Sequence, residues 1–255
     1  MPDSWWRRFR AYLTPPPIPD PLWREAVDAC PLAQRLDRRR QDELRELTSV
    51  FLARKRFHAL AGAELTPLHE ALIAMQASLP AMRQGPRALR GWREILVYPG
   101  EFKVRRSHHD DHSGVITEGD EVLIGEAWER GPLVLSLADV QLDLDQPWDG
   151  FNVVVHEIAH KLDMLDGSPD GVPLLPPHIQ RRQWIVAFQR AFDHLSNDVA
   201  RGRDTLIDPY AAESADEFFA VVSELHWSQP GVLRRADAAV AELLTAYYGP
   251  SPAPG

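Results

Sequence analysis

The chain has 255 residues but only one cysteine, Cys30, and it has no long apolar run. One cysteine excludes an internal disulfide framework and fits a reducing compartment, so we expect a cytoplasmic protein. A membrane-spanning helix needs about 18 or more consecutive apolar residues, and the sequence has no such stretch. The first residues also lack the apolar segment of a secretory signal. We therefore expect neither a transmembrane segment nor a secretory signal.

The chain also has no excess of basic over acidic residues. The chain carries 28 Lys and Arg against 37 Asp and Glu, which gives a formal net charge of −9. A nucleic-acid groove neutralises phosphates with clustered Lys and Arg, so this balance argues against direct binding of nucleic acid. Hydrophobic residues make up 44% of the chain, enough for a substantial core. The composition predicts a globular protein that folds without disulfides.

Residues 1–20 have the pattern of an N-terminal arm. Residues 4–13 read Ser-Trp-Trp-Arg-Arg-Phe-Arg-Ala-Tyr-Leu, and Pro15, Pro16 and Pro17 follow shortly after. Aromatic and basic segments of this kind can contact a membrane surface, but ten residues are short for an interfacial anchor. We therefore favour an arm that packs back on its own domain.

Residues 21–90 are expected to form a helical N-terminal part that packs on the domain after it, with residues 21–83 helical throughout. Two prolines, Pro67 and Pro80, punctuate the expected helices. Apolar residues recur at steps of three and four, as on the buried face of a helix. They are Leu44, Leu47, Phe51, Leu68, Leu72, Met75 and Leu79.

From Trp92 onward the pattern changes to short β-type runs bounded by Gly and Pro. A helix is then expected to begin near Gly150, with Asp149 as its N-cap. A small mixed sheet followed by helices predicts an α+β domain over residues 91–247, and a flexible tail over 248–255. The expected strands are 95–98, 102–104, 122–124 and 133–137, and the later helices lie near 178–196, 214–227 and 233–247.

Residues 156–160 read His-Glu-Ile-Ala-His, an H-E-x-x-H motif in an apolar run. On a helix that turns about 100° per residue, His156 and His160 lie about 40° apart and can bind one metal ion from the same face. Glu157 lies beside them, where a carboxylate can deprotonate an activated water. Apolar residues form a stripe on the opposite face, as a core-facing helix requires. The motif is typical of the zinc-binding helix of a metallopeptidase.

Two histidines leave a zinc site incomplete, and two acids follow them on the same segment. Asp166 stands where an extended H-E-x-x-H motif places a third ligand, but Asp163 occupies the position of the glycine that would turn the chain. If the helix continues, Asp166 points about 80° away from the histidines, which argues against ligation. Asp163 lies within about 20° of His156, but a full turn further along. This position suits an acid that hydrogen-bonds a ligand or a neighbouring loop, or an ordinary solvated carboxylate.

Two further candidates for the third ligand lie downstream, in the segment 208–220. Glu213 and Glu217 are one helical turn apart, so either can bind the metal while the other supports it. Ser214 and Glu217 also have the spacing of a capping box, in which Glu217 only reaches back to the backbone. The residues alone leave Glu217 slightly ahead, because it lies at the edge of an apolar helix face.

Three runs of the sequence resemble one bacterial protein family. They are His156–Asp163, Tyr210–Glu213 and Glu217–Ala220, with shorter matches at 96–99, 131–135 and 150–152. Over residues 22–247 the chain is similar to the Mlc titration factor family of bacterial zinc metallopeptidases. The run from Tyr210 to Ala220 is also similar to the catalytic domain of anthrax lethal factor. The resemblance implies a zincin-like metallopeptidase domain with a helical part before it.

The resemblance also implies roles for individual residues and a cofactor of one zinc ion per chain. The implied activity is hydrolysis of peptide bonds in a peptide or protein substrate, with aminopeptidase-like action as one form of it. The implied zinc ligands are His156, His160 and Glu217, and the implied catalytic pair is Glu157 and Tyr210. Glu213 then becomes a supporting neighbour of the ligands, beside Asp163, whose supporting role is expected from its place on the helix.

The same resemblance carries a rival function. The family takes its name from sequestering the transcriptional repressor Mlc, which implies a binding protein whose peptidase activity is secondary. The sequence does not choose between the two functions, although the intact H-E-x-x-H motif favours the enzyme.

The segment from Ser107 to His112, with three histidines and two aspartates, matches no family feature that we can name. Clusters of His and Asp bind metals readily, so a second metal site is one interpretation. On an expected loop, a solvated polar turn is the simpler one, and we favour it.

Overall fold

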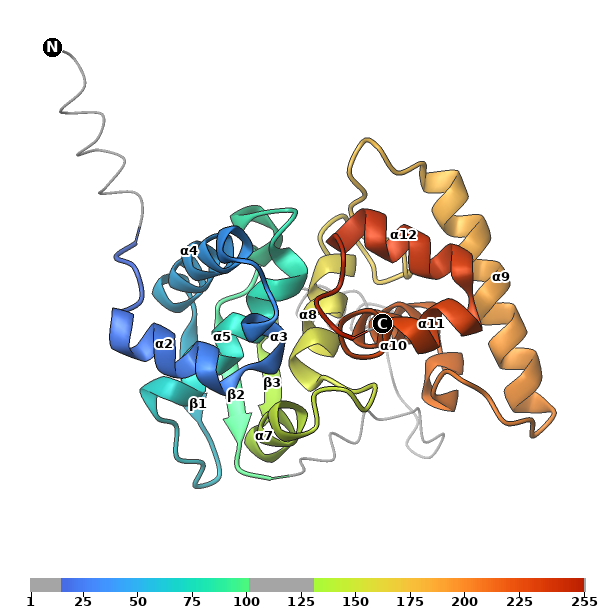
Figure 1. Ribbon diagram of the computed structural model, residues 1–255. Coiled ribbons are helices and arrows are strands. Elements are labelled where there is room, and N and C mark those ends of the chain that lie inside the picture. Colours follow the sequence, from blue (N-terminus) through green and yellow to red (C-terminus); the bar gives the residue numbers. More distant parts are fainter. Residues whose placement is uncertain (1–14, 101–130, 255) are drawn as a thin grey trace, which may run out of the picture.

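The computed structural model describes residues 15–100 and 131–254, and these form a helix-rich α+β fold with a small sheet (Figure 1). The strands expected at 102–104 and 122–124 and the segment 107–112 lie outside these residues. In chain order the elements are α2 (Asp20–Ala29), α3 (Pro31–Gln34), α4 (Arg38–Arg54), β1 (Arg56–Ala59), α5 (Pro67–Ala81), η1 (Pro86–Leu89), β2 (Glu94–Tyr98), β3 (Leu133–Ser136), α7 (Leu137–Asp145), α8 (Val153–Asp163), α9 (Arg181–Ala200), η2 (Pro209–Ala212), α10 (Ala215–Ser228), α11 (Pro230–Ala236) and α12 (Ala238–Tyr248).

The described strands pair in parallel, in the order β1-β2-β3. Phe57 of β1 pairs with Ile95 of β2, which pairs in turn with Leu133 of β3. Ile95 and Leu133 are fully buried and face the core. The expectation of helix throughout residues 21–83 is wrong at 56–59, which form strand β1. These four largely exposed residues have no alternating pattern from which a strand could be predicted. The expected mixed sheet is not seen among the described strands, since both pairings are parallel.

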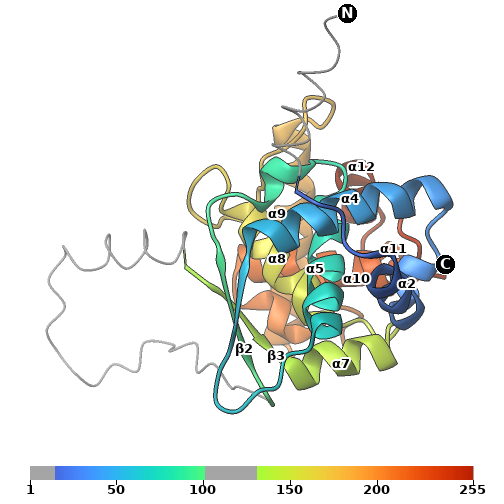
Figure 2. The same ribbon diagram turned by 90° about the vertical axis from the view of Figure 1, so that its left-hand side faces the viewer.

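Helix α8 runs through the middle of the protein, with α5 on one side and α10 on the other (Figures 1 and 2). Val154, Ile158 and Leu162 follow one another at steps of four and are fully buried. Burial of each such side chain contributes roughly 1.5–3 kcal/mol. The helix that carries the H-E-x-x-H motif is therefore held from both sides.

The N-terminus of α8 is set by Asn152 and not by the expected cap, Asp149. Asn152 Oδ1 accepts a hydrogen bond from Val155 N at 2.8 Å, and its Nδ2 donates to Gln76 Oε1 of α5 at 2.7 Å. The helix does not start at Gly150, because the φ of +106° at this residue lies outside the helical region. The cap thus ties the motif helix to α5.

Helix α7, which the sequence pattern did not predict, follows β3 directly. Ser136 is its N-cap, since Ser136 Oγ accepts a hydrogen bond from Asp139 N at 3.2 Å. Asp143 of α7 is buried, and its Oδ2 accepts a hydrogen bond from Val153 N at 2.7 Å. Burial raises the pKa of Asp143 to about 7. Helix α7 therefore supports the first turn of α8.

Aromatic side chains join α9, α10 and α12. Trp184 of α9 stacks on Phe188 at 4.2 Å between ring centroids. It also meets Phe219 of α10 at 5.9 Å and Tyr247 of α12 at 5.5 Å, both edge-on. The helices expected at 178–196 and 214–227 correspond to α9 and α10. The one expected at 233–247 is divided into α11 and α12 at Asp237, which caps α12.

The chain end after α12 lies against the N-terminal helices. Tyr248, expected as the first residue of a flexible tail, belongs to α12 and is buried. Arg40 Nη1 donates to the Pro250 carbonyl at 3.0 Å, and Arg35 Nε donates to the Pro252 carbonyl at 2.7 Å. These contacts hold the segment after α12 in place, although its composition predicted a flexible tail.

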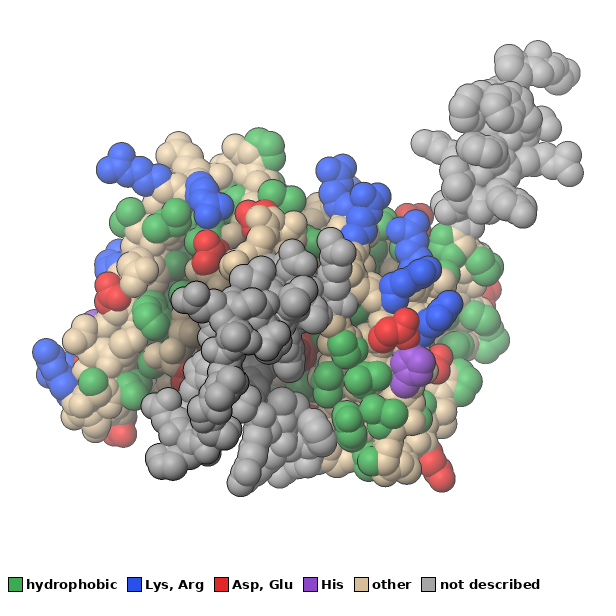
Figure 3. All heavy atoms as spheres, turned by 180° about the vertical axis from the view of Figure 1, so that it is seen from behind, with side chains coloured by type: hydrophobic (Ala, Val, Ile, Leu, Met, Phe, Trp, Pro, Cys, Tyr) green, Lys and Arg blue, Asp and Glu red, His purple; other side chains and the backbone are tan. Residues whose placement is uncertain are grey.

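Three features relate to what the composition predicted: the state of Cys30, the apolarity of the helices and the distribution of surface charge. Cys30 is free and buried, and its burial raises the pKa of the thiol to about 11. Within the described residues, no helix is both long and apolar enough to cross a membrane. On the coloured part of the face in Figure 3, Lys and Arg side chains stand in small groups beside acidic ones.

The loop between α8 and α9 folds back on the end of α8. Asp163 is fully buried, and its Oδ2 accepts a hydrogen bond from Gly171 N at 2.8 Å. The Gly171 carbonyl accepts one from Trp184 Nε1 at 2.9 Å. Gly171 has a φ of +76°, and a Cβ added there would lie 2.6 Å from the Ala215 carbonyl oxygen at the start of α10. This position requires glycine, and it joins α8, α9 and α10.

We expect Gly171→Ala to lower the free energy of unfolding by about 1–3 kcal/mol more than Gly202→Ala. Gly202 is the matched control, because its φ of +64° is similarly unfavourable for alanine but no atom lies within 4 Å of an added Cβ. Denaturant unfolding of both variants measures the difference. Equal losses would show that α10 yields to the added methyl group.

Candidate metal centre and active site

Helices α8 and α10 bring three side chains to one point. His156 and His160 lie on one face of α8, and Glu217 extends from the first turn of α10. Glu217 Oε2 lies 3.1 Å from His156 Nε2 and 3.4 Å from His160 Nε2. The two Nε2 atoms are 3.1 Å apart. Of the described residues, these three form a group that could hold a metal ion.

The spacing of the three atoms fits a tetrahedral metal site. Zinc bonds of 2.0–2.1 Å at tetrahedral angles place neighbouring ligand atoms about 3.3–3.4 Å apart. The observed separations of 3.1, 3.1 and 3.4 Å come close to this value. Two histidines and one carboxylate also form a common ligand set of catalytic zinc, in which the fourth position stays open. The residues present therefore fit the metal that the motif predicts.

Glu224 is a member of this site that sequence reasoning missed. Its Oε1 lies 2.7 Å from His156 Nδ1, and its Oε2 accepts a hydrogen bond from Asn152 N at 2.6 Å. A carboxylate on Nδ1 holds the proton there, which leaves Nε2 free to bind a metal. A signal existed in the sequence, because Glu224 follows Glu217 by two helical turns within a mostly apolar run.

Electrostatics at the site favour positive charge. Burial by itself disfavours a charged imidazole, but the hydrogen bonds to Glu217 and Glu224 outweigh it and raise the pKa of His156 to about 10. Burial likewise disfavours the Glu217 carboxylate, yet its hydrogen bonds with His156 and His160 hold its pKa well below the ordinary value. Two carboxylates thus lie against two imidazoles whose side chains are largely buried. Such a group of carboxylates favours a bound cation.

Glu157 and Tyr210 lie beside the ligand group and line the same cavity. This cavity holds about 410 Å³, and His156 and Glu224 also line it. Tyr210 belongs to η2, where Asp208 Oδ1 accepts a hydrogen bond from Tyr210 N at 2.8 Å. The ring centroids of Tyr210 and His156 are 6.3 Å apart. The cavity therefore joins one of the expected ligands, His156, to the expected catalytic pair.

The other acids considered from the sequence lie elsewhere. Asp166 forms an ion pair with Arg181 at 3.6 Å, on the loop after α8. Asp163 bonds that loop through Gly171, which is one of the roles its position allowed. Glu213 is exposed at the C-terminus of η2. Asp163 and Glu213 as supporting neighbours of the metal stay predictions.

Ser214 has the capping role that the sequence suggested, while Glu217 extends to the histidines. Ser214 Oγ accepts a hydrogen bond from Glu217 N at 3.4 Å and begins α10. The Glu217 carboxylate lies against His156 and His160. The cap therefore fixes the backbone from which the candidate third ligand extends.

Comparison with known proteins gives a family. A family model described as glucose-regulated metallo-peptidase M90 matches residues 3–249. Mlc titration factor A from Yersinia pestis (strain Pestoides F) is 37% identical over 235 residues, which cover 90% of this chain and 84% of that protein. The protein of the same name from Yersinia pseudotuberculosis (serotype O:1b, strain IP 31758) has the same identity and coverage. The resemblance read from the sequence is therefore confirmed, and the chain belongs to the M90 family of glucose-regulated metallopeptidases.

Proposed function

We propose that this chain is a zinc-dependent peptidase that hydrolyses peptide bonds. The observation that carries the proposal is the convergence of His156, His160 and Glu217 on one point, with spacings of 3.1–3.4 Å. Membership of a metallopeptidase family supports it. Zinc is the metal of choice because two imidazoles and one carboxylate are its usual catalytic ligands. When bound there, zinc supplies a Lewis acid that polarises a carbonyl and acidifies water.

Glu157 acts as the general base and then as the general acid. It follows His156 on α8 and lines the cavity that His156 and Tyr210 also line. A carboxylate in this place accepts a proton from the attacking water and passes it to the leaving amine. Because α8 is packed on two sides, the carboxylate starts from a fixed backbone position.

Tyr210 stabilises the negative charge that develops on the carbonyl oxygen. Its ring lies beside that of His156, and the capped turn of η2 holds its backbone. A hydroxyl that donates a hydrogen bond to such an oxyanion contributes about 2–4 kcal/mol when the geometry is that of an oxyanion hole.

The cavity beside the ligand group accepts the substrate. Leu142 and Phe151, which line it, are 47% and 52% exposed, so the cavity wall presents apolar surface to solvent. We propose that they contact apolar parts of a peptide. Strand β3 lies at the edge of the described sheet, and an extended substrate backbone can pair with such an edge. Aminopeptidase-like cleavage is one form of this activity.

Replacement of the base tests the mechanism. We expect Glu157→Gln to keep bound zinc, because the three ligands remain, and to lower kcat about 10²–10⁴-fold. The measurement is digestion of a peptide library by both proteins, with zinc content determined in parallel. Near-native cleavage by the variant would exclude Glu157 as the base.

Metal content tests the ligand assignment. We expect Glu217→Ala to lower the zinc bound per chain, because one of three ligands is lost. Glu213→Ala and Asp166→Ala should change it much less, since neither carboxylate belongs to the converging group. Elemental analysis of the purified variants distinguishes the three. A loss of zinc on replacing Asp166 or Glu213, with Glu217→Ala unchanged, would refute the assignment.

Glu224 offers a third test, because it acts on zinc only through His156. We expect Glu224→Gln to weaken zinc binding about 10–100-fold, since an amide cannot accept both of the hydrogen bonds that the carboxylate accepts. Competition with a chelator measures the affinity. Glu242→Gln, an exposed glutamate on α12, is the control and should leave the affinity unchanged. Equal affinities of both variants and the unaltered protein would show that Glu224 does not orient the ligand.

A second function is favoured by the name of the relatives, Mlc titration factor A. In this alternative the chain binds a transcriptional repressor of the Mlc type, and the peptidase activity is secondary. We infer a cytoplasmic location from the single cysteine alone, and this location suits both functions. Glu157→Gln discriminates them: if the variant keeps binding of the repressor and the cellular effect, sequestration accounts for the function, and if the effect is lost, catalysis does.

A further inference from the structure

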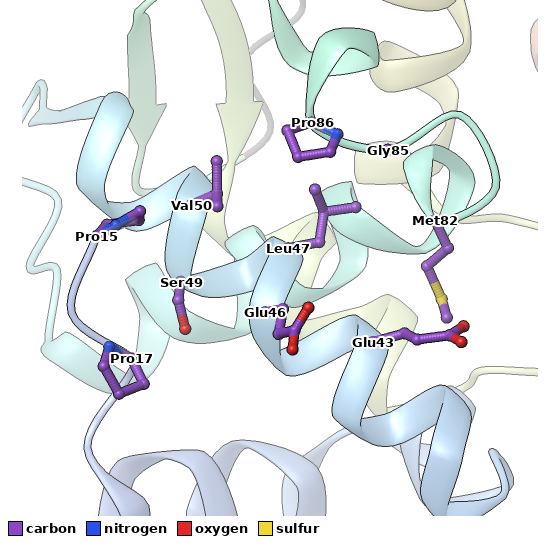
Figure 4. Close-up of a pocket in the computed structure, with 10 residues that line it drawn as sticks. All are labelled: Pro15, Pro17, Glu43, Glu46, Leu47, Ser49, Val50, Met82, Gly85 and Pro86. Carbon is purple, nitrogen blue, oxygen red and sulfur yellow. The ribbon is translucent and has the colours of Figure 1, made fainter. Parts of the chain in front are cut away.

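A second cavity, remote in sequence from the catalytic residues, lies among the N-terminal helices (Figure 4). It holds about 500 Å³, within the range of small-molecule and peptide side-chain sites. It is formed by α4, the end of α5, the start of η1 and the extended segment before α2. The lining residues are Pro15, Pro17, Glu43, Glu46, Leu47, Ser49, Val50, Met82, Gly85 and Pro86.

The cavity is mainly apolar with acidic residues on one wall. Leu47, Val50 and Met82 give it apolar surface, and the charged residues of the described lining are Glu43 and Glu46. Glu43 forms an exposed ion pair with Arg39 at 3.0 Å. Glu46 is exposed, and among the described residues no ion pair involves it. The cavity is therefore suited to apolar or aromatic groups accompanied by positive charge.

The rim of the cavity is also the place where the described chain begins. Ile18 N donates to Ser49 Oγ of α4 at 2.9 Å, and Arg45 Nη2 donates to the Ile18 carbonyl at 2.7 Å. These bonds fix the segment that contains Pro15 and Pro17 against α4, as Figure 4 shows for the two prolines. Any residue that precedes Pro15 therefore starts at the opening of the cavity.

We propose that this cavity binds residues 4–13 of the same chain. That segment contains four aromatic residues and three arginines, and no acidic residue. Its composition complements the apolar wall and the two glutamates. The distance is no obstacle, because each extended residue spans about 3.3–3.6 Å and the segment ends directly before the rim.

Covalent connection makes this occupant the favoured one. A segment joined by a short linker has an effective concentration of about millimolar, so weak contacts suffice to keep it bound. Prolines restrict the linker and lower the entropy lost on binding. Stacking of aromatic rings on the Met82 thioether and on apolar side chains adds favourable contacts. The arm then covers an apolar surface that would otherwise face solvent.

A photo-crosslinking experiment on the full chain tests the proposal. Trp6 is replaced by benzoylphenylalanine, the dilute protein is irradiated, and the linked peptides are identified by mass spectrometry. We expect links within one chain to the segments 43–50 and 82–86. Links to other surfaces, links between two copies, or no links would each overturn the proposal.

Charge variants make the test specific. In the labelled chain, the double variant Glu43→Lys and Glu46→Lys should lower the yield of these links about fivefold, because attraction to the arginines becomes repulsion. Asp42→Lys is the matched control, since Asp42 is exposed on the same helix but does not line the cavity. Adding Arg7→Glu, Arg8→Glu and Arg10→Glu to the double variant should restore the yield. Equal crosslink yields in all of these charge variants would contradict the proposed complementarity.

Discussion

The contact between helices α8 and α10 is the constraint on which the rest of the candidate site depends. Helix α8 presents the two histidines, and α10 presents Glu217 and, two turns later, Glu224. Glu217 meets the side of the imidazoles where a metal would bind, whereas Glu224 holds the opposite nitrogen of His156. One helix pair thus supplies the candidate ligands and the group that orients one of them. Small shifts between these helices would change the distances from Glu217 to both histidines together.

This helix pair is itself supported from several directions. Gln76 of α5 binds the cap residue Asn152, and Asp143 of α7 binds the first turn of α8. At the other end, Asp163 and Gly171 connect α8 to the loop that touches the start of α10. Polar groups of α8 and its cap therefore have partners on α5, α7, α10 and the loop before α9, which restricts both the position of the helix and its rotation about its own axis. Catalytic metal sites depend on such fixed positions.

Local pattern predicted much of this arrangement, and long-range contacts account for most of what it missed. Helical spacing placed His156 and His160 on one face, and the apolar stripe opposite them is buried as expected. The residues alone favoured Glu217 over Glu213 as the third ligand only slightly. The family resemblance then supported Glu217. Glu224 was missed because its partner His156 lies far away in the sequence, and periodicity reports no partners across such distances. Strand β1 and helix α7 were missed for a related reason, since both are short elements fixed by tertiary contacts.

The placement of Glu217 and Glu224 on α10 has a consequence for how the protein is made. Synthesis proceeds from the N-terminus, so the histidines of α8 leave the ribosome before α10 exists. Until α10 has emerged, His156 has neither the carboxylate that holds its Nδ1 nor the candidate third ligand, Glu217, beside its Nε2. A nascent chain therefore offers a metal only two histidines. For a metal held by this group, stable uptake would belong to the last stage of folding, when the C-terminal helices close against α8.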